Sequence, residues 1–157
     1  MTSHIVRSTT RGTAGAALLS LLAAVCGAQR SAVDSALAHY MVLLKSAPPE
    51  STAALYTADG QLLEPGMNPL TGPAAIRAFL EPIARTITVH EAVATPEATE
   101  VYGDSIGYQW GTYHQVAGPK DAPPATYDGR FVIEWRFTPA GWRIARFLVQ
   151  PNPPPRR

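Results

Sequence analysis

Few side chains in this sequence have the types and spacing that could support chemistry. The lone cysteine, the scattered histidines and the missing motifs exclude several kinds of site. Cys26 is the only cysteine, so neither an intrachain disulfide nor a cysteine-rich zinc site can form. The four histidines, at positions 4, 39, 90 and 114, lack the close spacing of metal ligands. No Gly-x-Ser-x-Gly motif, phosphate loop or nucleotide fingerprint is present. The remaining chemistry is proton transfer by carboxyl, phenol and imidazole groups, and we expect no metal and no cofactor.

The length and composition indicate one globular domain without a nucleic-acid partner. The chain has 157 residues, of which 46% are hydrophobic and 16% are charged. Its 13 basic and 12 acidic residues give a net charge of +1, without the basic surface that DNA or RNA requires.

Residues 1–28 are predicted to be a secretory signal peptide. Arg7 and Arg11 precede an apolar run from Ala14 to Val25, which is shorter than the roughly 20 residues that span a bilayer. Cleavage after Ala28 would leave residues 29–157, of which residues 29–150 form the domain, and the protein would be secreted or periplasmic. Two alternatives stay open: a lipoprotein anchored through Cys26, and a buried N-terminal helix.

Three helices are predicted in the first half of the mature chain. The first covers residues 32–46 and begins at Ser31 and Asp34, the second covers residues 50–56, and the third begins at Pro73. The apolar stripes of the first and third helices are Val33, Leu37, Tyr40, Met41 and Leu44, and Ile76, Phe79, Leu80 and Ile83.

After Arg85 the hydrophobic period changes to two, which predicts long antiparallel strands. Asp59-Gly60 and Gly103-Asp104 are predicted turns. The core-facing residues are predicted to be Ile87, Val89, Glu91 and Val93, then Ile106, Tyr108, Trp110 and Thr112, then Phe131, Ile133, Trp135 and Phe137. A fourth strand runs from Trp142 to Val149, and residues 151–157 form a disordered proline-rich tail. Helices followed by strands predict an α+β fold, in which a strongly curved antiparallel sheet on three N-terminal helices encloses an apolar cone.

Several segments carry a family resemblance. They are the runs Leu55–Gly60, Glu64–Gly66 and Thr71–Leu80, followed by Gly111-Thr112-Tyr113, Gly129-Arg130-Phe131 and Gly141-Trp142-Arg143-Ile144. Over residues 34–149 the chain resembles the NTF2-like superfamily, and most closely its SnoaL-like and DUF4440-type members. The resemblance implies the NTF2-like cone and a homodimer formed through the outer face of the sheet. Because this superfamily includes isomerases, dehydratases and non-catalytic modules, the fold does not determine the function.

A narrower resemblance, to the ketosteroid isomerases, implies two catalytic residues. Tyr40 matches their oxyanion-donating tyrosine, and Glu64, which precedes Pro65, matches their general base. Ile133 stands where those enzymes have a second, acidic donor, so steroid isomerisation itself is not expected. Dehydratases of this fold use two histidines on neighbouring strands, and His114, near a strand end, is the better candidate here.

Three hypotheses about function remain open. The first is a pocket for a small hydrophobic molecule, lined by Tyr56, Met67, Phe79, Tyr108, Trp110, Phe131, Ile133 and Trp135. The second is a cofactor-free acid–base isomerase, lyase or dehydratase that uses Glu64 and Tyr40, with His114 as a further catalytic candidate. The third is a non-catalytic dimerisation or interaction module, in which side chains fill the cone and the face of the sheet binds a partner. For the two candidate residues the structural alternatives are that Tyr40 packs in the core and that Glu64 caps backbone amides near Gly66.

Overall fold

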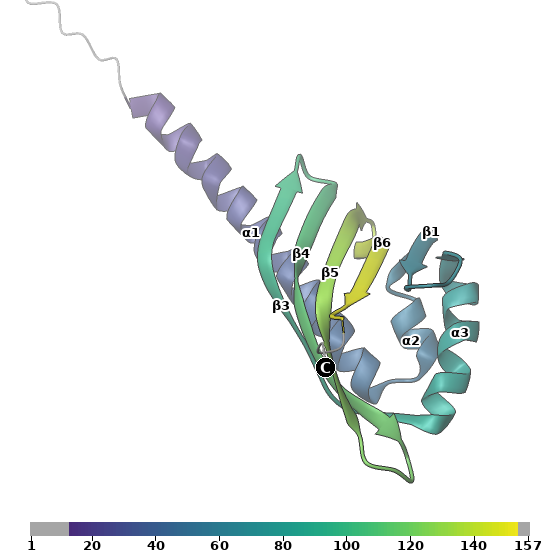
Figure 1. Ribbon diagram of the computed structural model, residues 1–157. Helices are drawn as coiled ribbons and strands as arrows, with labels where there is room; N and C mark the ends of the chain where they lie inside the picture. Colours follow the sequence, from purple (N-terminus) through teal and green to yellow (C-terminus); the bar gives the residue numbers. More distant parts are fainter. Residues whose placement is uncertain (1–12, 154–157) are drawn as a thin grey trace, which may run out of the picture.

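The computed structural model describes residues 13–153, with side chains from residue 27 onward. Predictions about Arg7, Arg11, the side chain of Cys26 and residues 154–157 lie outside the described residues. The elements in chain order are α1 (Thr13–Ser46), α2 (Pro49–Ala53), β1 (Tyr56–Leu63), β2 (Leu70–Thr71), α3 (Gly72–Thr86), β3 (Ile87–Tyr102), β4 (Ile106–Pro119), β5 (Ala125–Thr138) and β6 (Gly141–Pro151). This arrangement confirms the α+β class (Figure 1).

The strands form one sheet in the order β2-β1-β6-β5-β4-β3. All neighbours are antiparallel except β1 and β6, which are parallel, with Leu62 opposite Phe147. Figure 1 shows the long strands β3 to β6 curving past α1, with α2 and α3 on the side of β1. The helices α1 and α3 contact opposite ends of this sheet, since α1 packs mainly on β3 and α3 on β1. The concave space between them is where the sequence predicted the interior of the cone.

The first helix begins earlier than predicted. Ser31 and Asp34 were expected to start it, but α1 begins at Thr13 and both residues lie within it. The Ser35 hydroxyl donates a hydrogen bond to the carbonyl of Ser31, one helical turn earlier, at 2.8 Å. The Ala- and Leu-rich run before Ser31 has high helix propensity, so no cap is needed there.

The Asp34 side chain instead ties α1 to the sheet. Its Oδ1 accepts hydrogen bonds from Thr99 Oγ1 at 2.6 Å and from Gln109 Nε2 at 2.8 Å. Gln109 is completely buried, and its Oε1 accepts a bond from Trp135 Nε1 at 3.2 Å. The network therefore joins α1 to β3, β4 and β5, and it satisfies an amide that would be costly to bury unpaired.

The inner face of β4 is the opposite of the predicted one. Gly107, Gln109 and Gly111 are buried, whereas Tyr108 is 40% exposed on the outer face that it shares with Trp110. The predicted face of β4 contains more apolar residues. The opposite face is the inner one, because the side chains of α1 and of the neighbouring strand β5 lie too close to it for large residues. A Cβ at Gly107 would lie 3.4 Å from both Trp135 Cβ and Val33 Cγ2, so a small residue there lets α1 approach the sheet.

Strand irregularities shift two further predictions. In β3 the register slips between Val89 and Glu91, so Val93 is 45% exposed and Ala92 is half-buried, which reverses the predicted alternation beyond Val89. The predicted Asp59-Gly60 turn lies inside β1, whose register against β6 also shifts between Tyr56 and Gln61. At this irregularity a Cβ on Gly60 would lie 2.7 Å from the carbonyl oxygen of Ile144, so glycine is required there.

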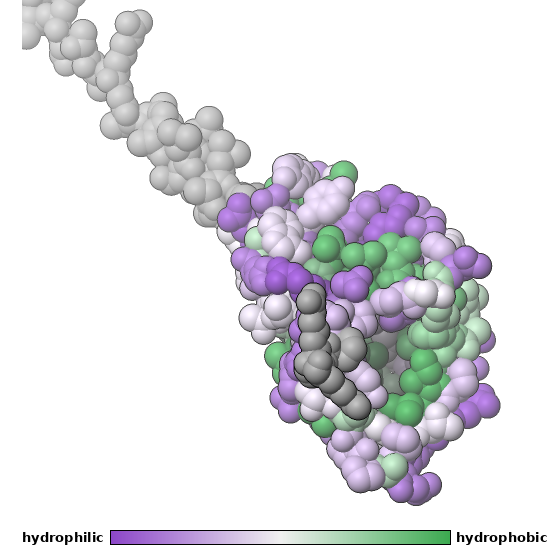
Figure 2. All heavy atoms as spheres, in the orientation of Figure 1, coloured by the Kyte–Doolittle hydropathy of each residue, from purple (hydrophilic) through white to green (hydrophobic). Residues whose placement is uncertain are grey.

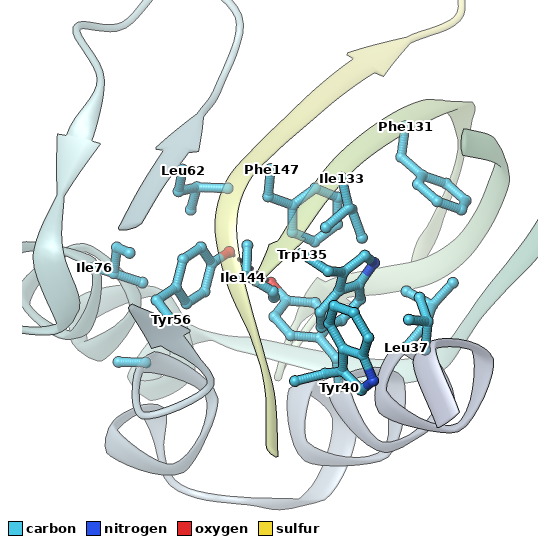
Figure 3. Packing of buried hydrophobic residues seen from close by; sticks show 13 residues of the cluster. Leu37, Tyr40, Tyr56, Leu62, Ile76, Phe131, Ile133, Trp135, Ile144 and Phe147 are labelled. Atoms are coloured by element: carbon cyan, nitrogen blue, oxygen red, sulfur yellow. Dashed lines mark hydrogen bonds between the residues drawn. The ribbon is translucent and has the colours of Figure 1, made fainter. Parts of the chain in front are cut away.

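The core fills the space between α1, β1 and the inner faces of β5 and β6 (Figure 3). The predicted β5 face is confirmed for Phe131, Ile133 and Trp135, but Phe137 is 54% exposed at the strand end, where it contacts Trp142 edge to face. The buried cluster consists of Val33, Leu37, Tyr40, Ala53, Tyr56, Leu62, Ile76, Phe131, Ile133, Trp135, Trp142, Ile144 and Phe147.

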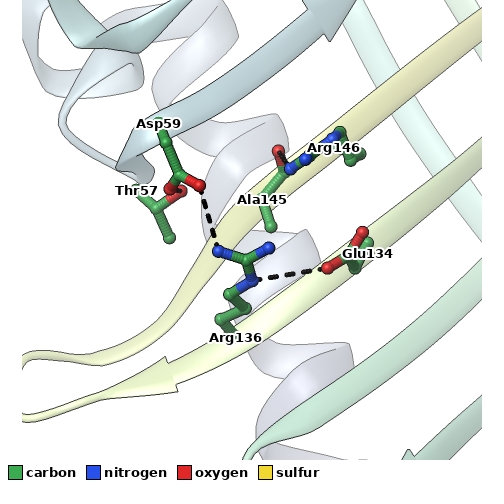
Figure 4. Close-up of polar contacts among 6 residues, drawn as sticks. All are labelled: Thr57, Asp59, Glu134, Arg136, Ala145 and Arg146. Atoms are coloured by element: carbon green, nitrogen blue, oxygen red, sulfur yellow. Dashed lines mark hydrogen bonds and ion pairs between the residues drawn. The ribbon is translucent and has the colours of Figure 1, made fainter.

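On the outer surface, Arg136 links β1 and β5 (Figure 4). Its Nη1 lies 3.1 Å from Asp59 Oδ2 and its Nε lies 3.4 Å from Glu134 Oε1. A bond from the Thr57 hydroxyl and the nearby Arg136 guanidinium lower the pKa of Asp59. Exposed pairs of this kind contribute about 1 kcal/mol or less, so this link orders the surface more than it stabilises the fold.

Candidate functional site

A cavity of about 360 Å³ opens between α1, α3 and the inner faces of β3 to β6. This volume is within the usual range for small-molecule sites, roughly 300–1,000 Å³. Figure 2 shows a hollow on this face of the molecule, with apolar side chains gathered along its rim. The lining is mostly aliphatic and aromatic and consists of Tyr40, Met41, Leu44, Leu62, Glu64, Phe79, Leu80, Ile83, Ile87, Val89, Ala92, Val93, Tyr113, His114, Gln115, Tyr127, Phe131, Phe147, Val149 and Pro151.

The structure brings some of the predicted site residues to this cavity and separates others from it. The three catalytic candidates, Tyr40, Glu64 and His114, all line it, as do Phe79 and Phe131. The other predicted pocket residues do not line it. Tyr56, Ile133 and Trp135 are buried in the core below, Met67 is 47% exposed in the loop after β1, and Tyr108 and Trp110 lie on the outer face of β4.

Glu64 reaches the cavity because of its place after β1. Alternate residues of a strand share a face, so Glu64 follows Leu62, which is buried and also lines the cavity. The carboxyl group is half-buried among apolar side chains. This loss of water raises the pKa of Glu64, because burial disfavours its charged form. A carboxyl group whose pKa is raised in this way is a stronger proton acceptor than an exposed one, which suits a general base.

Two buried phenols lie beneath this carboxyl group. The hydroxyl oxygens of Tyr40 and Tyr56 are 3.5 Å apart, and Figure 3 shows them pointing toward one another. Burial raises the pKa of Tyr40 to about 12 and raises that of Tyr56 well above its ordinary value. The negative charge of Glu64 acts on both pKa values in the same direction. Both phenols are therefore protonated at neutral pH, and Tyr40 also lines the cavity.

Tyr113 is a cavity residue that sequence reasoning missed, because it lies on the unpredicted face of β4. Its ring packs over Gly129 on β5, where an added Cβ would lie 2.5 Å from Tyr113 Cε1. Burial, followed by the charges of Glu64 and Asp128, raises the pKa of Tyr113. The signal available in the sequence was a glycine in the middle of an otherwise aromatic strand, which is typical of a close approach.

His114 has a carboxylate partner. Its Nδ1 lies 2.7 Å from Asp128 Oδ1, since the two residues face each other across β4 and β5. Asp128 was not predicted, because pairing across strands needs the register. A dehydratase-like pair with His114 would need His90, the histidine on the neighbouring strand β3. His90 is exposed and does not line the cavity, and Val93 is the residue opposite His114. The dehydratase-like pair of histidines is therefore not formed.

Neither a metal-ion cluster nor a membrane-spanning helix is found among the described residues. Among the described residues, no three histidine, cysteine or acidic side chains lie close enough together to hold a metal ion. Over the same part of the chain, none of the helices combines the length and the apolarity needed to cross a membrane.

The fold is similar to that of several solved structures. A ketosteroid isomerase-like protein from Erwinia carotovora atroseptica matches with a TM-score of 0.71 and 16% identity, over 80% of this chain and 98% of that chain. An NTF2-like protein with a cystatin-like fold from Novosphingobium aromaticivorans matches with a TM-score of 0.66 and 22% identity, over 85% of each chain. A scytalone dehydratase-like protein from the same organism matches with a TM-score of 0.68 and 16% identity, over 78% of this chain and 83% of that chain.

At these identities the structural matches show the fold alone. No curated protein matches the sequence significantly. The model of the SnoaL-like domain matches residues 28–147, which include α2, α3 and most of the sheet. The chain therefore belongs to the SnoaL-like family, within the NTF2-like fold.

Proposed function

We propose that this protein binds a small hydrophobic molecule in the cavity between α3 and the sheet. The observation that carries the proposal is the cavity of about 360 Å³ whose lining is dominated by apolar side chains. Transfer of apolar ligand surface from water into such a cavity stabilises the complex by about 25 cal/mol per Å². The SnoaL-like family membership supports a small-molecule role in general terms.

Filling the cavity tests this proposal. Ala92 is half-buried on β3 and lines the cavity, so Ala92→Leu places extra methyl groups inside it. The extra methyl groups would overlap with the ligand at a cost of about 1–3 kcal/mol, so the variant should bind 1-decanol roughly tenfold more weakly in a calorimetric titration. Ala54→Leu, at an exposed position after α2, should leave binding unchanged. Equal affinity of the two variants would contradict the proposal.

A second candidate function is acid–base catalysis, which is favoured because Glu64 and Tyr40 line the same cavity. Glu64, whose pKa burial raises, would take a proton from the carbon next to a carbonyl group. Tyr40 would then donate a hydrogen bond to the enolate oxygen, and return of the proton to a different carbon of a conjugated enolate would complete an isomerisation. His114, oriented by Asp128, stands as a further proton-transfer candidate at the mouth of the cavity.

Proton exchange tests this chemistry without knowledge of the substrate. A hydrophobic cyclic ketone is incubated with the protein in deuterated water, and loss of its α-proton signals is followed by NMR. Glu64→Gln should abolish any exchange above the buffer rate. Glu50→Gln, which removes a carboxylate from the exposed surface of α2, should retain it. Exchange that survives in Glu64→Gln would reject the role of Glu64 as the base.

We also infer that residues 1–28 direct export and are removed. The family match begins at residue 28, and none of the described side chains from residue 27 to residue 32 is buried, which agrees with cleavage after Ala28. In a host with the bacterial export machinery, the mature protein should have the mass of residues 29–157, and Ala28→Arg should prevent the cleavage. A product that begins with lipid-modified Cys26 would establish the lipoprotein alternative instead.

The outer face of the sheet supports a homodimer. Trp110, Val132 and Leu148 form one apolar row across β4, β5 and β6, with Val132 and Leu148 each more than two-fifths exposed. Val132→Glu should convert a dimer to a monomer in analytical ultracentrifugation, because a buried unpaired carboxylate opposes association. Val42→Glu, on the exposed side of α1, is the matched control.

A further inference from the structure

A second hollow, of about 290 Å³, adjoins the cavity where α1 ends and β3 begins. Five branched aliphatic side chains line both hollows: Leu44, Leu80, Ile83, Ile87 and Val89. Because these side chains belong to both linings, they form a common wall. A molecule that extends from the cavity across this wall stays in contact with apolar surface.

The second hollow differs from the cavity in its charge. Lys45, in the last turn of α1, and Lys120, in the turn after β4, both line it, and they are the only two lysines of the sequence. The backbone amide of Lys120 donates to the carbonyl of Thr86 at 3.2 Å, which holds this turn against the end of α3. We refer to the space between Lys45, Thr88 and Lys120 as the lysine hollow.

Neither lysine forms an ion pair within the described part of the chain. None of the ion pairs there involves Lys45 or Lys120. No carboxylate is among the described residues that line the lysine hollow, and the other polar groups on its lining, such as Ser46 and Thr88, are hydroxyls. The hollow therefore combines two ammonium groups, hydroxyl groups and an apolar wall, which suits an anionic group at the end of an apolar chain.

Glu64 makes the two ends of the joined hollows differ in charge. It lines the cavity but not the lysine hollow, so the two ends of a spanning molecule would meet opposite charges. A ligand carboxylate beside Glu64 would be repelled, whereas beside Lys45 and Lys120 it would be attracted. The common wall of the two hollows is aliphatic, and a flexible alkyl chain can follow two adjoining hollows better than a rigid ring system can.

We propose that the ligand of this cavity is a monocarboxylic acid with an alkyl chain, which places its chain in the cavity and its carboxylate between Lys45 and Lys120. This inference rests on the proposed binding function, because it assigns the ligand class of the same cavity. Two partly exposed charge contacts predict a preference of roughly tenfold for a carboxylate over the alcohol of equal chain length. The preference should shrink as salt is added, because exposed charges are screened.

The experiment compares decanoate with 1-decanol on the folded protein, by calorimetric titration at neutral pH and low ionic strength. The unaltered protein should bind decanoate roughly tenfold more tightly than 1-decanol. The variant K45M/K120M keeps long apolar side chains but loses both charges, and it should bind the two compounds equally. Arg77→Met removes an exposed cation that pairs with Glu81 and lines neither hollow, so it should keep the preference.

The outcomes separate the two proposals. Binding of 1-decanol without a preference for decanoate would overturn the acid as ligand and leave the apolar-pocket proposal standing. A preference that persists in K45M/K120M would overturn the assignment to these lysines. If neither compound binds to the unaltered protein, both proposals fail together. Circular dichroism of K45M/K120M checks its fold, which should be retained because both lysines are exposed.

Discussion

The hydroxyl oxygens of Tyr40 and Tyr56 lie 3.5 Å apart in the core, although one tyrosine comes from α1 and the other begins β1. Their rings meet edge to face, with centroids 6.3 Å apart. This contact joins the helix that crosses the sheet to the strand that brings Glu64 to the cavity. The two phenols therefore connect the stability of the fold to the geometry of the candidate site.

A double-mutant cycle should detect this contact. Tyr40→Phe and Tyr56→Phe should each lower the free energy of unfolding by about 1 kcal/mol, since each leaves a buried hydroxyl without its partner. The double variant should be more stable than additivity predicts, with a coupling of about 0.5–1 kcal/mol in urea denaturation. Strict additivity would show that the two hydroxyls do not interact.

The same phenols predict a loss of stability at alkaline pH. Burial raises the pKa of Tyr40 from 10.0 to about 12 and moves that of Tyr56 in the same direction, so each folded phenol holds its proton more tightly than in the unfolded chain. Their contribution is fully present below pH 10 and is lost as the pH rises toward 12. Urea denaturation at about pH 9 and about pH 11 should show this fall, and Tyr40→Phe/Tyr56→Phe should reduce it.

Glu64 predicts that the free energy of unfolding falls with rising pH, which is opposite to the effect of an ion-paired carboxylate. Because burial raises its pKa above 4.5, the folded protein binds this proton more tightly than the unfolded chain does. The free energy of unfolding therefore falls as the pH rises from 4.5 through the folded-state pKa. Glu64→Gln should be more stable than the unaltered protein at about pH 7, with a smaller difference at about pH 4, in urea titrations. Glu50→Gln is the control for the loss of one charge, and a Glu64→Gln variant that is less stable at neutral pH would contradict the burial argument.

Gln109 predicts the largest loss of stability among these variants. Gln109→Leu keeps the approximate shape but removes the bonds to Asp34 and Trp135, which leaves the buried indole N–H of Trp135 without an acceptor. We expect a loss of about 2–3 kcal/mol in the free energy of unfolding. Asp34→Asn retains an oxygen acceptor and should cost less than about 1 kcal/mol. Similar effects of the two variants would argue against the network as the cause.

The sequence predicts strand faces well where the two faces differ in chemistry. On β5, the inward Phe131, Ile133 and Trp135 alternate with charged residues such as Arg130 and Glu134, so period two identifies the core face. On β4 both faces carry aromatic residues, and the inner one is marked by glycines and Gln109. That face was predicted wrongly, since only the packing of α1 and the bond to Asp34 explain why an amide and two glycines lie inside.

The site was predictable as far as chemistry follows local pattern. Glu64 lies at the end of a short strand beside a proline, and Tyr40 lies on a helical stripe, so both could be proposed from sequence and both line the cavity. Tyr113 and Asp128 could not be proposed in this way. Their places depend on the register between β4 and β5 and on a glycine in the facing strand, which are relations between distant segments.

The parallel pairing of β1 with β6 has a consequence for how the molecule assembles. The hairpins from β3 to β6 pair strands that are neighbours along the chain. In contrast, β1 pairs with β6, which is synthesised after the other five strands. Contacts between such distant segments slow folding, because a long loop must close before they form. The nascent chain therefore completes the Glu64 wall of its cavity only after the C-terminal strand has left the ribosome.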